Sequence, residues 1–198
     1  NTAVGRSALL ANVTGNNNTA LGFNALISST GSSNTGLGTS TLQSNTSGND
    51  NTAVGRNALA ANTTGGSNVA IGALALDANT TGNFNIGVGK DVLGNNTTGI
   101  GNTGVGAFSL TAVQTSSNNT AVGSGSLQYN TAADNTSFGG NALKLNTTGT
   151  NNVAVGKSAL TANTTASNNT AVGKDALTAN TTGDLNVAIG VSALASNT

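Results

Sequence analysis

The sequence predicts an all-β protein, a repetitive β-solenoid or β-roll in which short strands from successive repeats stack on one another. A unit of 16 or 17 residues recurs through the whole chain, and a fixed short period is typical of solenoid arrays. Gly, present 28 times, returns at one fixed position of every unit, and a Gly at that spacing disfavours helices. Glu, Met and Pro are absent, which removes two good helix formers and also excludes a collagen-like chain.

The repeats form a single array that covers residues 1–198, the last copy being incomplete. Nine of the spacings between repeat starts are 17 residues and two are 16. The twelve repeats start at residues 1, 18, 34, 51, 68, 85, 102, 119, 135, 152, 169 and 186. Because the chain begins on a repeat boundary and stops inside a repeat, we expect it to be a segment of a longer protein. Residues are described below by their position in this repeat, from 1 to 17.

Five positions keep their chemistry in every copy. Position 1 is Asn, position 2 is β-branched, position 4 is large and apolar, position 5 is Gly and position 9 is Leu. Positions 2 and 4 are expected on one face of a strand, because side chains alternate. The small residue between them would let another backbone approach closely. Gly at position 5 predicts a bend with positive φ, and the following N-T-T-G predicts a turn with a left-handed Gly.

Stacked repeats predict rows of identical side chains along the solenoid axis. Strands in a sheet lie about 4.8 Å apart, so equivalent Asn residues would form amide ladders. Asn1 and its equivalents are the first candidates. Asn12, Asn62, Asn79 and their equivalents form a second row, for which simple turn capping is the alternative. Each coil offers little apolar core, so we expect Leu9 and its equivalents to pack against other chains in a homotrimer.

The variable positions predict the outer surface. Position 6 ranges from Arg6 and Lys90 to Gly140 and carries five of the six basic residues. We expect it to face water, as a solubility-giving stripe or as a weak adhesive edge. The segment Thr111–Ser117 lacks the N-T-T-G turn and predicts a bulge, a kink or a small binding spot. Three aromatic residues lie in or near it, Phe108, Tyr129 and Phe138, of which Phe138 is expected to replace Val in the core.

Composition excludes several kinds of site. Without His or Cys, nucleophilic catalysis with a histidine base and Cys/His zinc sites are impossible. The Asp residues are scattered, and those at Asp134 and Asp184 are expected to be solvated turn residues rather than ligands of an ion. We predict no enzyme and no catalytic, cofactor-binding or metal-binding residues. Zero net charge argues against nucleic acid and anionic membranes as partners, and no apolar run is long enough to cross a bilayer.

The repeat resembles two families of fibrous proteins. "NVAIG" at 68–72 and 186–190, and "NTAVG" elsewhere, resemble the head repeats of YadA-like trimeric autotransporter adhesins. The unit "NTAVGRNALAANTTGGS" at 51–67 resembles the repeated shaft of bacteriophage tail-fibre proteins. The resemblance implies three chains packed as side-by-side left-handed rolls, or an intertwined three-chain β-helix. It also implies a place in a virion tail fibre or on a cell surface. The period of 17 is longer than that of the adhesin heads, so the path of the coil is expected to differ.

The leading hypothesis for function is therefore a structural fibre segment, a phage tail-fibre shaft or a cell-surface adhesin head. Such a segment spaces or presents a receptor-binding surface, with a cell-surface glycan or protein as the possible receptor. The first alternative is an ice-binding solenoid built on Thr pairs such as Thr63-Thr64 and Thr80-Thr81. The second is a glycan-acting enzyme, which would need two carboxylates that only the stacking of repeats could bring together.

Overall fold

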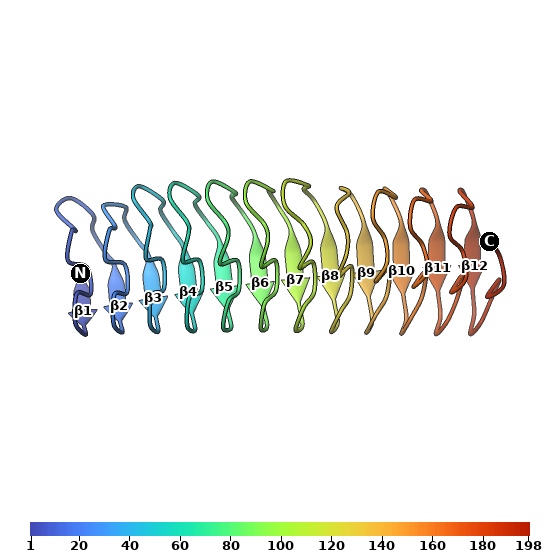
Figure 1. Ribbon diagram of the computed structural model, residues 1–198, viewed down its shortest axis with the longest axis horizontal. Helices are drawn as coiled ribbons and strands as arrows, with labels where there is room; N and C mark the ends of the chain where they lie inside the picture. The colour runs from blue at the N-terminus through green and yellow to red at the C-terminus, as the bar shows by residue number, and fades with distance from the viewer.

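The computed structural model describes residues 1–198 and confirms an all-β solenoid with no helix. Twelve strands of three residues each form one parallel sheet in the order β1 to β12 (Figure 1). The strands are β1 (Thr2–Val4), β2 (Thr19–Leu21), β3 (Thr35–Leu37), β4 (Thr52–Val54), β5 (Val69–Ile71), β6 (Ile86–Val88), β7 (Thr103–Val105), β8 (Thr120–Val122), β9 (Thr136–Phe138), β10 (Val153–Val155), β11 (Thr170–Val172) and β12 (Val187–Ile189).

Each strand pairs with the equivalent strand of the next repeat in the same chain, so the molecule is a solenoid of one chain rather than an intertwined helix. Thr52 pairs with Val69, and Val54 pairs with Ile71. Figure 1 shows flattened coils stacked into a rod with the two termini at opposite ends. Only 22 of the 126 backbone–backbone hydrogen bonds belong to the strands. The other bonds lie in the turns, so successive coils are bonded around their whole circumference.

The interior is a row of Leu side chains, one from position 9 of each coil. Leu26 to Leu177 are fully buried, so the prediction that they pack against other chains is wrong. The small residue at position 3 also points inward. It was expected to let another backbone approach closely, but it lies instead against the Leu side chains of the interior. A Cβ added to Gly36 would lie 3.3 Å from Cδ1 of Leu26. The coil is too thin for a larger side chain at that position, and positions 2 and 4 therefore point outward.

Two ladders of Asn side chains run along the axis, as predicted. At position 1, the backbone N–H of Asn51 donates to Oδ1 of Asn34 at 3.0 Å, and its Nδ2 donates to the carbonyl of Gly65 at 2.9 Å. At position 12, Nδ2 of Asn62 donates to Oδ1 of Asn45 at 2.8 Å and also caps Gly65 at 2.9 Å. The second row therefore combines the ladder with turn capping.

The bend at position 5 has the predicted conformation. Gly123 has a φ of 131°, and a Cβ on it would lie 2.6 Å from the carbonyl carbon of Gly139 in the next coil. The Gly of the N-T-T-G turn, in contrast, is not left-handed. A Cβ on Gly65 would approach the carbonyl oxygen of Gly82 closely, although Ser116 and Ala166 hold this position in other coils. The left-handed residues lie at positions 7, 9 and 17, and they include Leu76 at a φ of 53°.

The irregular segment Thr111–Ser117 forms neither a bulge nor a kink. Strand β7 keeps its register with β8, so that Thr103 pairs with Thr120. Val113 fills the interior place that Asn holds in the other ladder coils, and it is fully buried. The segment therefore differs from the others in its interior chemistry rather than in its path.

Candidate functional site

The outward side chains of the sheet form a surface that runs the length of the rod. We call it the strand face and define it as positions 2 and 4 of all twelve repeats, the first and third residues of β1–β12. Val4, Ile71 and Phe138 of this face are 56%, 40% and 44% exposed. The expectation that Phe138 lies in the core is wrong, because the inward residue of its strand is Ser137. Phe138 instead projects outward from the sheet.

No charged residue lies on the strand face. The six basic residues occupy position 6 or 10, and the six Asp residues occupy positions 7, 10, 16 and 17. They are Arg6, Arg56, Lys90, Lys144, Lys157, Lys174, Asp50, Asp77, Asp91, Asp134, Asp175 and Asp184. Exposed apolar side chains without charges are characteristic of the centre of an interface, where charged residues are depleted. Scattered exposed apolar residues, by contrast, are ordinary on any protein surface.

The strand face is large enough for a specific contact. Twelve coils at about 4.8 Å per coil give a face about 58 Å long, and three strand residues make it about 10 Å wide. Two such faces in contact would bury roughly 1,200 Å² in total, at the lower end of the range for stable protein–protein interfaces. This surface is therefore the best candidate for an interaction site.

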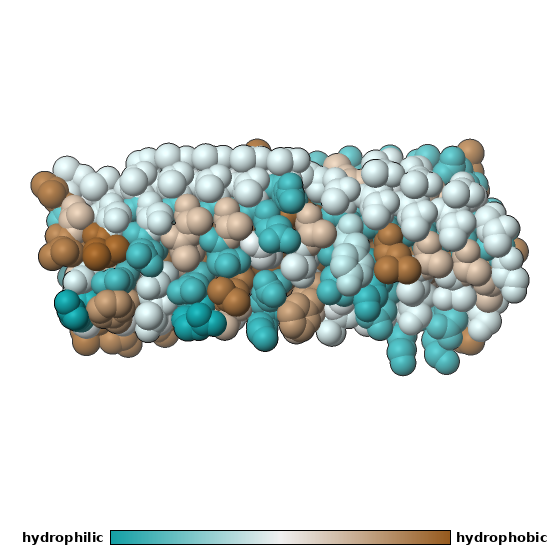
Figure 2. Space-filling model, viewed as in Figure 1, coloured by the Kyte–Doolittle hydropathy of each residue, from teal (hydrophilic) through white to brown (hydrophobic).

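The other surfaces are less uniform. Figure 2 shows a face on which hydrophilic and hydrophobic side chains are interspersed along the axis, with no continuous hydrophobic row. The rod has no pocket. A small-molecule site is usually a concave, largely preformed cavity, so the described surface offers none of that kind.

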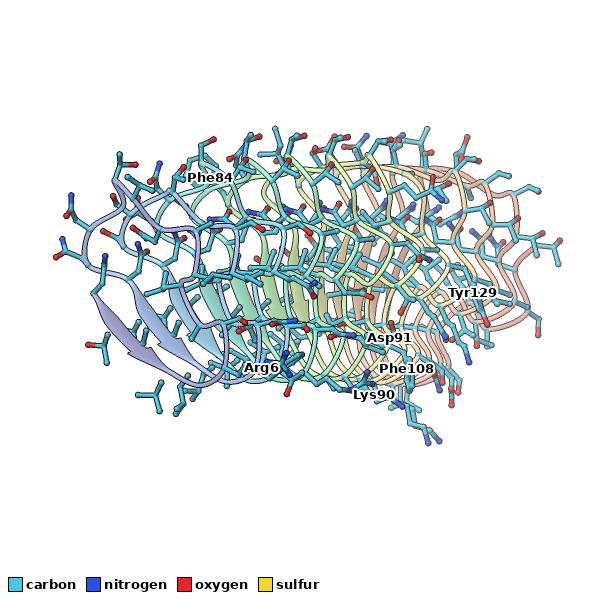
Figure 3. The ribbon with its side chains drawn as sticks, turned by 60° about the vertical axis from the view of Figure 1, so that its left-hand side comes forward. Arg6, Phe84, Lys90, Asp91, Phe108 and Tyr129 are labelled. Carbon is cyan, nitrogen blue, oxygen red and sulfur yellow. The ribbon has the colours of Figure 1, made fainter.

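Position 6 forms an edge of the rod that is exposed in most coils, as predicted. Arg6 lies over the ring of Phe23, with 5.7 Å from Cζ to the ring centroid, and Lys90 lies over Phe108 at 5.6 Å from Nζ. Figure 3 shows Arg6, Lys90 and Phe108 at the same edge and Phe84 at the opposite one. Cation–π contacts at exposed sites contribute only about 0.5–1 kcal/mol. They hold these side chains along the edge without forming a pocket.

Stacking brings one pair of carboxylates toward each other, Asp77 and Asp91 on adjacent coils. Their Oδ1 atoms would lie 3.6 and 2.5 Å from a Cβ built on Gly94. Partial burial raises the pKa of Asp77 above its ordinary value, and the negative charge of Asp91 adds to that rise. No third acidic, His or Cys side chain joins them into a metal-binding group. Asp77 and Asp91 are therefore two neighbouring carboxylates without the further ligands that would enclose a metal ion.

The remaining acidic candidates serve as hydrogen-bond acceptors in turns. Oδ1 of Asp184 accepts a bond from the backbone N–H of Ser167 at 2.6 Å. Oδ1 of Asp134 accepts one from Nδ2 of Asn118 at 3.2 Å. The first bond belongs to a third row of contacts, at position 16, in which a backbone N–H donates to the equivalent side chain of the next coil. The sequence analysis did not find this row, because its acceptor varies between Asn, Ser and Asp.

The Thr pairs do not form a flat double row. The hydroxyl of Thr63 donates to the carbonyl of Thr80 at 3.0 Å, and Thr63 is half-buried. Thr64 beside it is exposed. Only the second Thr of each regular turn is therefore fully available to solvent.

The sequence analysis expected a large side chain of the strand face, Phe138, in the core, which is the wrong side of the strand. The signal that could have located the strand face is the size pattern along the strand. Position 3 is Ala, Gly or Ser in every repeat, whereas position 4 is Val, Leu, Ile or Phe. A thin coil can accept only the small residue inside, so the large one must point outward.

No protein-family profile, curated protein or solved structure matches this chain. The structure also contains no helix that is long and apolar enough to cross a bilayer. The fold and the strand face are therefore the observations from which a function can be argued.

Proposed function

We propose that this chain is a rigid segment of a fibre, a phage tail-fibre shaft or a cell-surface adhesin head, that spaces or presents a receptor-binding surface. It acts as a homotrimer in which the chains pack through their strand faces. The observation that carries the proposal is the uncharged strand face that extends from β1 to β12, with a large apolar side chain at position 4 of every coil and Thr, Val or Ile at position 2. A lone rod would leave this face in water, whereas copies of the same chain can cover it along its whole length.

The shape of the molecule supports a spacing role. Twelve near-identical coils stack without interruption, and the termini lie at opposite ends of the rod (Figure 1). The three-residue strands, the two Asn ladders and the Leu row all repeat with the coil. Stability in such an array comes from contacts between neighbouring coils, so rod length can change while the fold stays the same.

The composition of the strand face favours packing over the alternative of ice binding. A surface that matches a regular lattice requires side chains of uniform size. Position 2 is Thr in eight of the twelve coils, but position 4 beside it varies from Val105 through Leu21 to Phe138. Variation among large apolar residues is characteristic of hydrophobic packing, which tolerates changes in shape when the total volume is accommodated.

Analytical ultracentrifugation of the intact chain and one matched pair of variants tests the proposal. The parent is expected to sediment at three times the chain mass of 19.0 kDa. Val105→Lys, on the strand face, is expected to lower that mass, because an unpaired charge would be buried at the interface. Thr115→Lys, on an exposed turn of the same coil, is expected to leave it unchanged. Circular dichroism checks that both variants keep the parent fold. A folded monomeric parent at micromolar concentration, or a trimeric Val105→Lys, would overturn the proposal.

A further inference from the structure

We propose that Phe138 and the open corner at Gly140 set the axial register in which copies of this chain associate. This inference rests on the proposed packing through the strand faces. It goes further because it assigns to one coil the task of aligning chains whose other coils are nearly alike.

Axial alignment is a real problem for a repetitive interface. A shift of one coil moves a chain by about 4.8 Å, and eleven of the twelve coils present a β-branched residue at position 2 with an aliphatic residue at position 4. A shifted pair of rods would lose only the contacts of one coil at each end. Register is weakly specified wherever a repetitive pattern looks the same after a shift, so a distinct residue is needed to fix it.

Phe138 is the distinct residue of the strand face. It is the only aromatic residue at positions 2 and 4 of the twelve repeats, and it is 44% exposed. Its neighbours in the sheet are Val122 on β8 and Val155 on β10. The ring therefore stands above a row of smaller side chains as a single knob.

The same coil carries a corner without a side chain. Gly140 is the only Gly at position 6, and the nearest atom that a Cβ there would meet is the carbonyl oxygen of Ser124, at 3.9 Å. In the coil before it, positions 6 and 7 are the small residues Ser124 and Gly125. In the coil after it, position 6 is the exposed Lys157.

A knob and an open corner on one coil favour alignment without a shift. In the proposed trimer, with parallel chains around a three-fold axis that runs along the rods, equivalent coils of all copies lie at the same height. Phe138 of one copy then lies level with Gly140 of the next. A shift of one coil in one direction would bring Phe138 level with Lys157, and a shift in the other would bring it level with Ser124. Only the unshifted assembly therefore places the ring beside a corner with no side chain.

Cysteine cross-linking measures the register directly, because the chain has no native cysteine. Chains with Val88→Cys and chains with Val105→Cys, one repeat apart on the strand face, are co-refolded and treated with a short bismaleimide. Mass spectrometry then gives the ratio of mixed 88–105 links to like 88–88 and 105–105 links. Like links are expected to dominate in the parent background. Adding Phe138→Val is expected to raise the ratio several-fold, because the shifted assemblies become comparable in free energy.

A second pair of variants tests the corner. Gly140→Lys is expected to raise the ratio of mixed links as Phe138→Val does, whereas Ala107→Lys, at position 6 two coils earlier, is expected to leave it at the parent value. A ratio unchanged by both Phe138→Val and Gly140→Lys would overturn the inference and leave the proposed packing intact. An absence of cross-links in every background would overturn contact through the strand faces, and the inference with it.

Discussion

Coils 3–6, residues 34–101, and coils 7–8, residues 102–134, share the strand and the bend after it, although coil 8 is one residue shorter in its turn, and they differ in the position-12 row of the interior. In coils 3–6 the position-12 ladder is complete, with Nδ2 of Asn79 donating to Oδ1 of Asn62 at 2.8 Å. In coil 7 Val113 replaces the Asn, so that Oδ1 of Asn96 is buried without a partner. The hydroxyl of Ser116 is also buried without a partner.

The comparison shows which features determine the fold. The position-1 ladder continues through both regions, and the backbone N–H of Asn119 still donates to Oδ1 of Asn102 at 3.0 Å. The Leu row and the strands also continue, through Leu110 and Leu127. One interrupted ladder therefore leaves the path of the chain unchanged, because the other rows hold the coils in register. The interruption still removes amide contacts that couple neighbouring coils.

The largest expected effect comes from the feature that the two regions share. Leu76→Asp in coil 5 and Leu127→Asp in coil 8 would each place an unpaired charge in a fully buried row. Each is expected to destabilise the protein by several kcal/mol, with local unfolding of neighbouring coils. Thermal melts monitored by circular dichroism measure both.

Ala73→Asp, three residues before Leu76 on the half-buried position-6 edge, is the control and should be nearly silent. Equal tolerance of Leu76→Asp and Ala73→Asp would contradict the assignment of inner and outer positions. A much smaller effect at Leu127 than at Leu76 would show that the Leu row is weaker in the irregular region.

The second prediction concerns the bend beside the irregular turn. Gly123→Val in coil 8 is expected to destabilise the solenoid by more than the roughly 1–3 kcal/mol of backbone strain alone. Its Cβ would also overlap the backbone of Gly139. Gly140→Ala is the matched control, because that corner is open. Urea denaturation of the two variants gives the difference, and a midpoint for Gly123→Val equal to that of the control would disprove the assigned constraint.

Exchanging the ladder residues tests the comparison most directly. Asn79→Val would remove the donor to Asn62 and the acceptor of Asn96, which should cost roughly 1–3 kcal/mol for each buried group left unpaired. Val113→Asn would give Asn96 a donor, and it is expected to stabilise the protein by about 1 kcal/mol.

For a chain of this size the gain from Val113→Asn corresponds to a rise in Tm of about 2–4 °C. Hydrogen exchange should show slower opening of coils 6–8 in Val113→Asn and faster opening of coils 4–6 in Asn79→Val. A destabilised Val113→Asn would mean that the interior of coil 7 has adapted to Val and that the ladder is not what distinguishes the two regions.

The smallest effect concerns the carboxylate pair on coils 5 and 6. Burial raises the pKa of Asp77 above its ordinary value of 3.8, so the folded state holds this proton more tightly than the unfolded state does. The free energy of unfolding should therefore fall as the pH rises from 3.8 through the raised pKa, and then stay level. Asp77→Asn should remove that fall and slightly raise Tm at pH 7. Melts between pH 3 and 7 check the sign, and a parent that gained stability from this group with rising pH would contradict it.

The sequence predicted the features that follow from the repeat period. It missed the features that depend on how thin the coil is. The strands, their order, both Asn ladders and the bend at Gly123 follow from the repeat, because equivalent residues must stack. The outward side of the strand does not follow from alternation alone, since either face could be the inner one. The left-handed conformation of Leu76 was also missed. That conformation costs roughly 1–2 kcal/mol in isolation. Burial of the Leu76 side chain and the hydrogen bond from its N–H to the carbonyl of Val92 at 3.0 Å offset that cost.

The direction of the hydrogen bonds has a mechanical consequence. The bonds between coils, such as that from Leu59 N–H to the carbonyl of Ala75 at 3.0 Å, join one coil to the next along the length of the rod. A pull on the two ends would therefore load every junction between coils equally, because the junctions lie in series. The strength of the whole is then that of its weakest junction. The junctions on either side of Val113, between coils 6 and 7 and between coils 7 and 8, lack the position-12 amide bond that joins coils 3 to 6. Away from its ends, a stretched rod should therefore part beside coil 7 first.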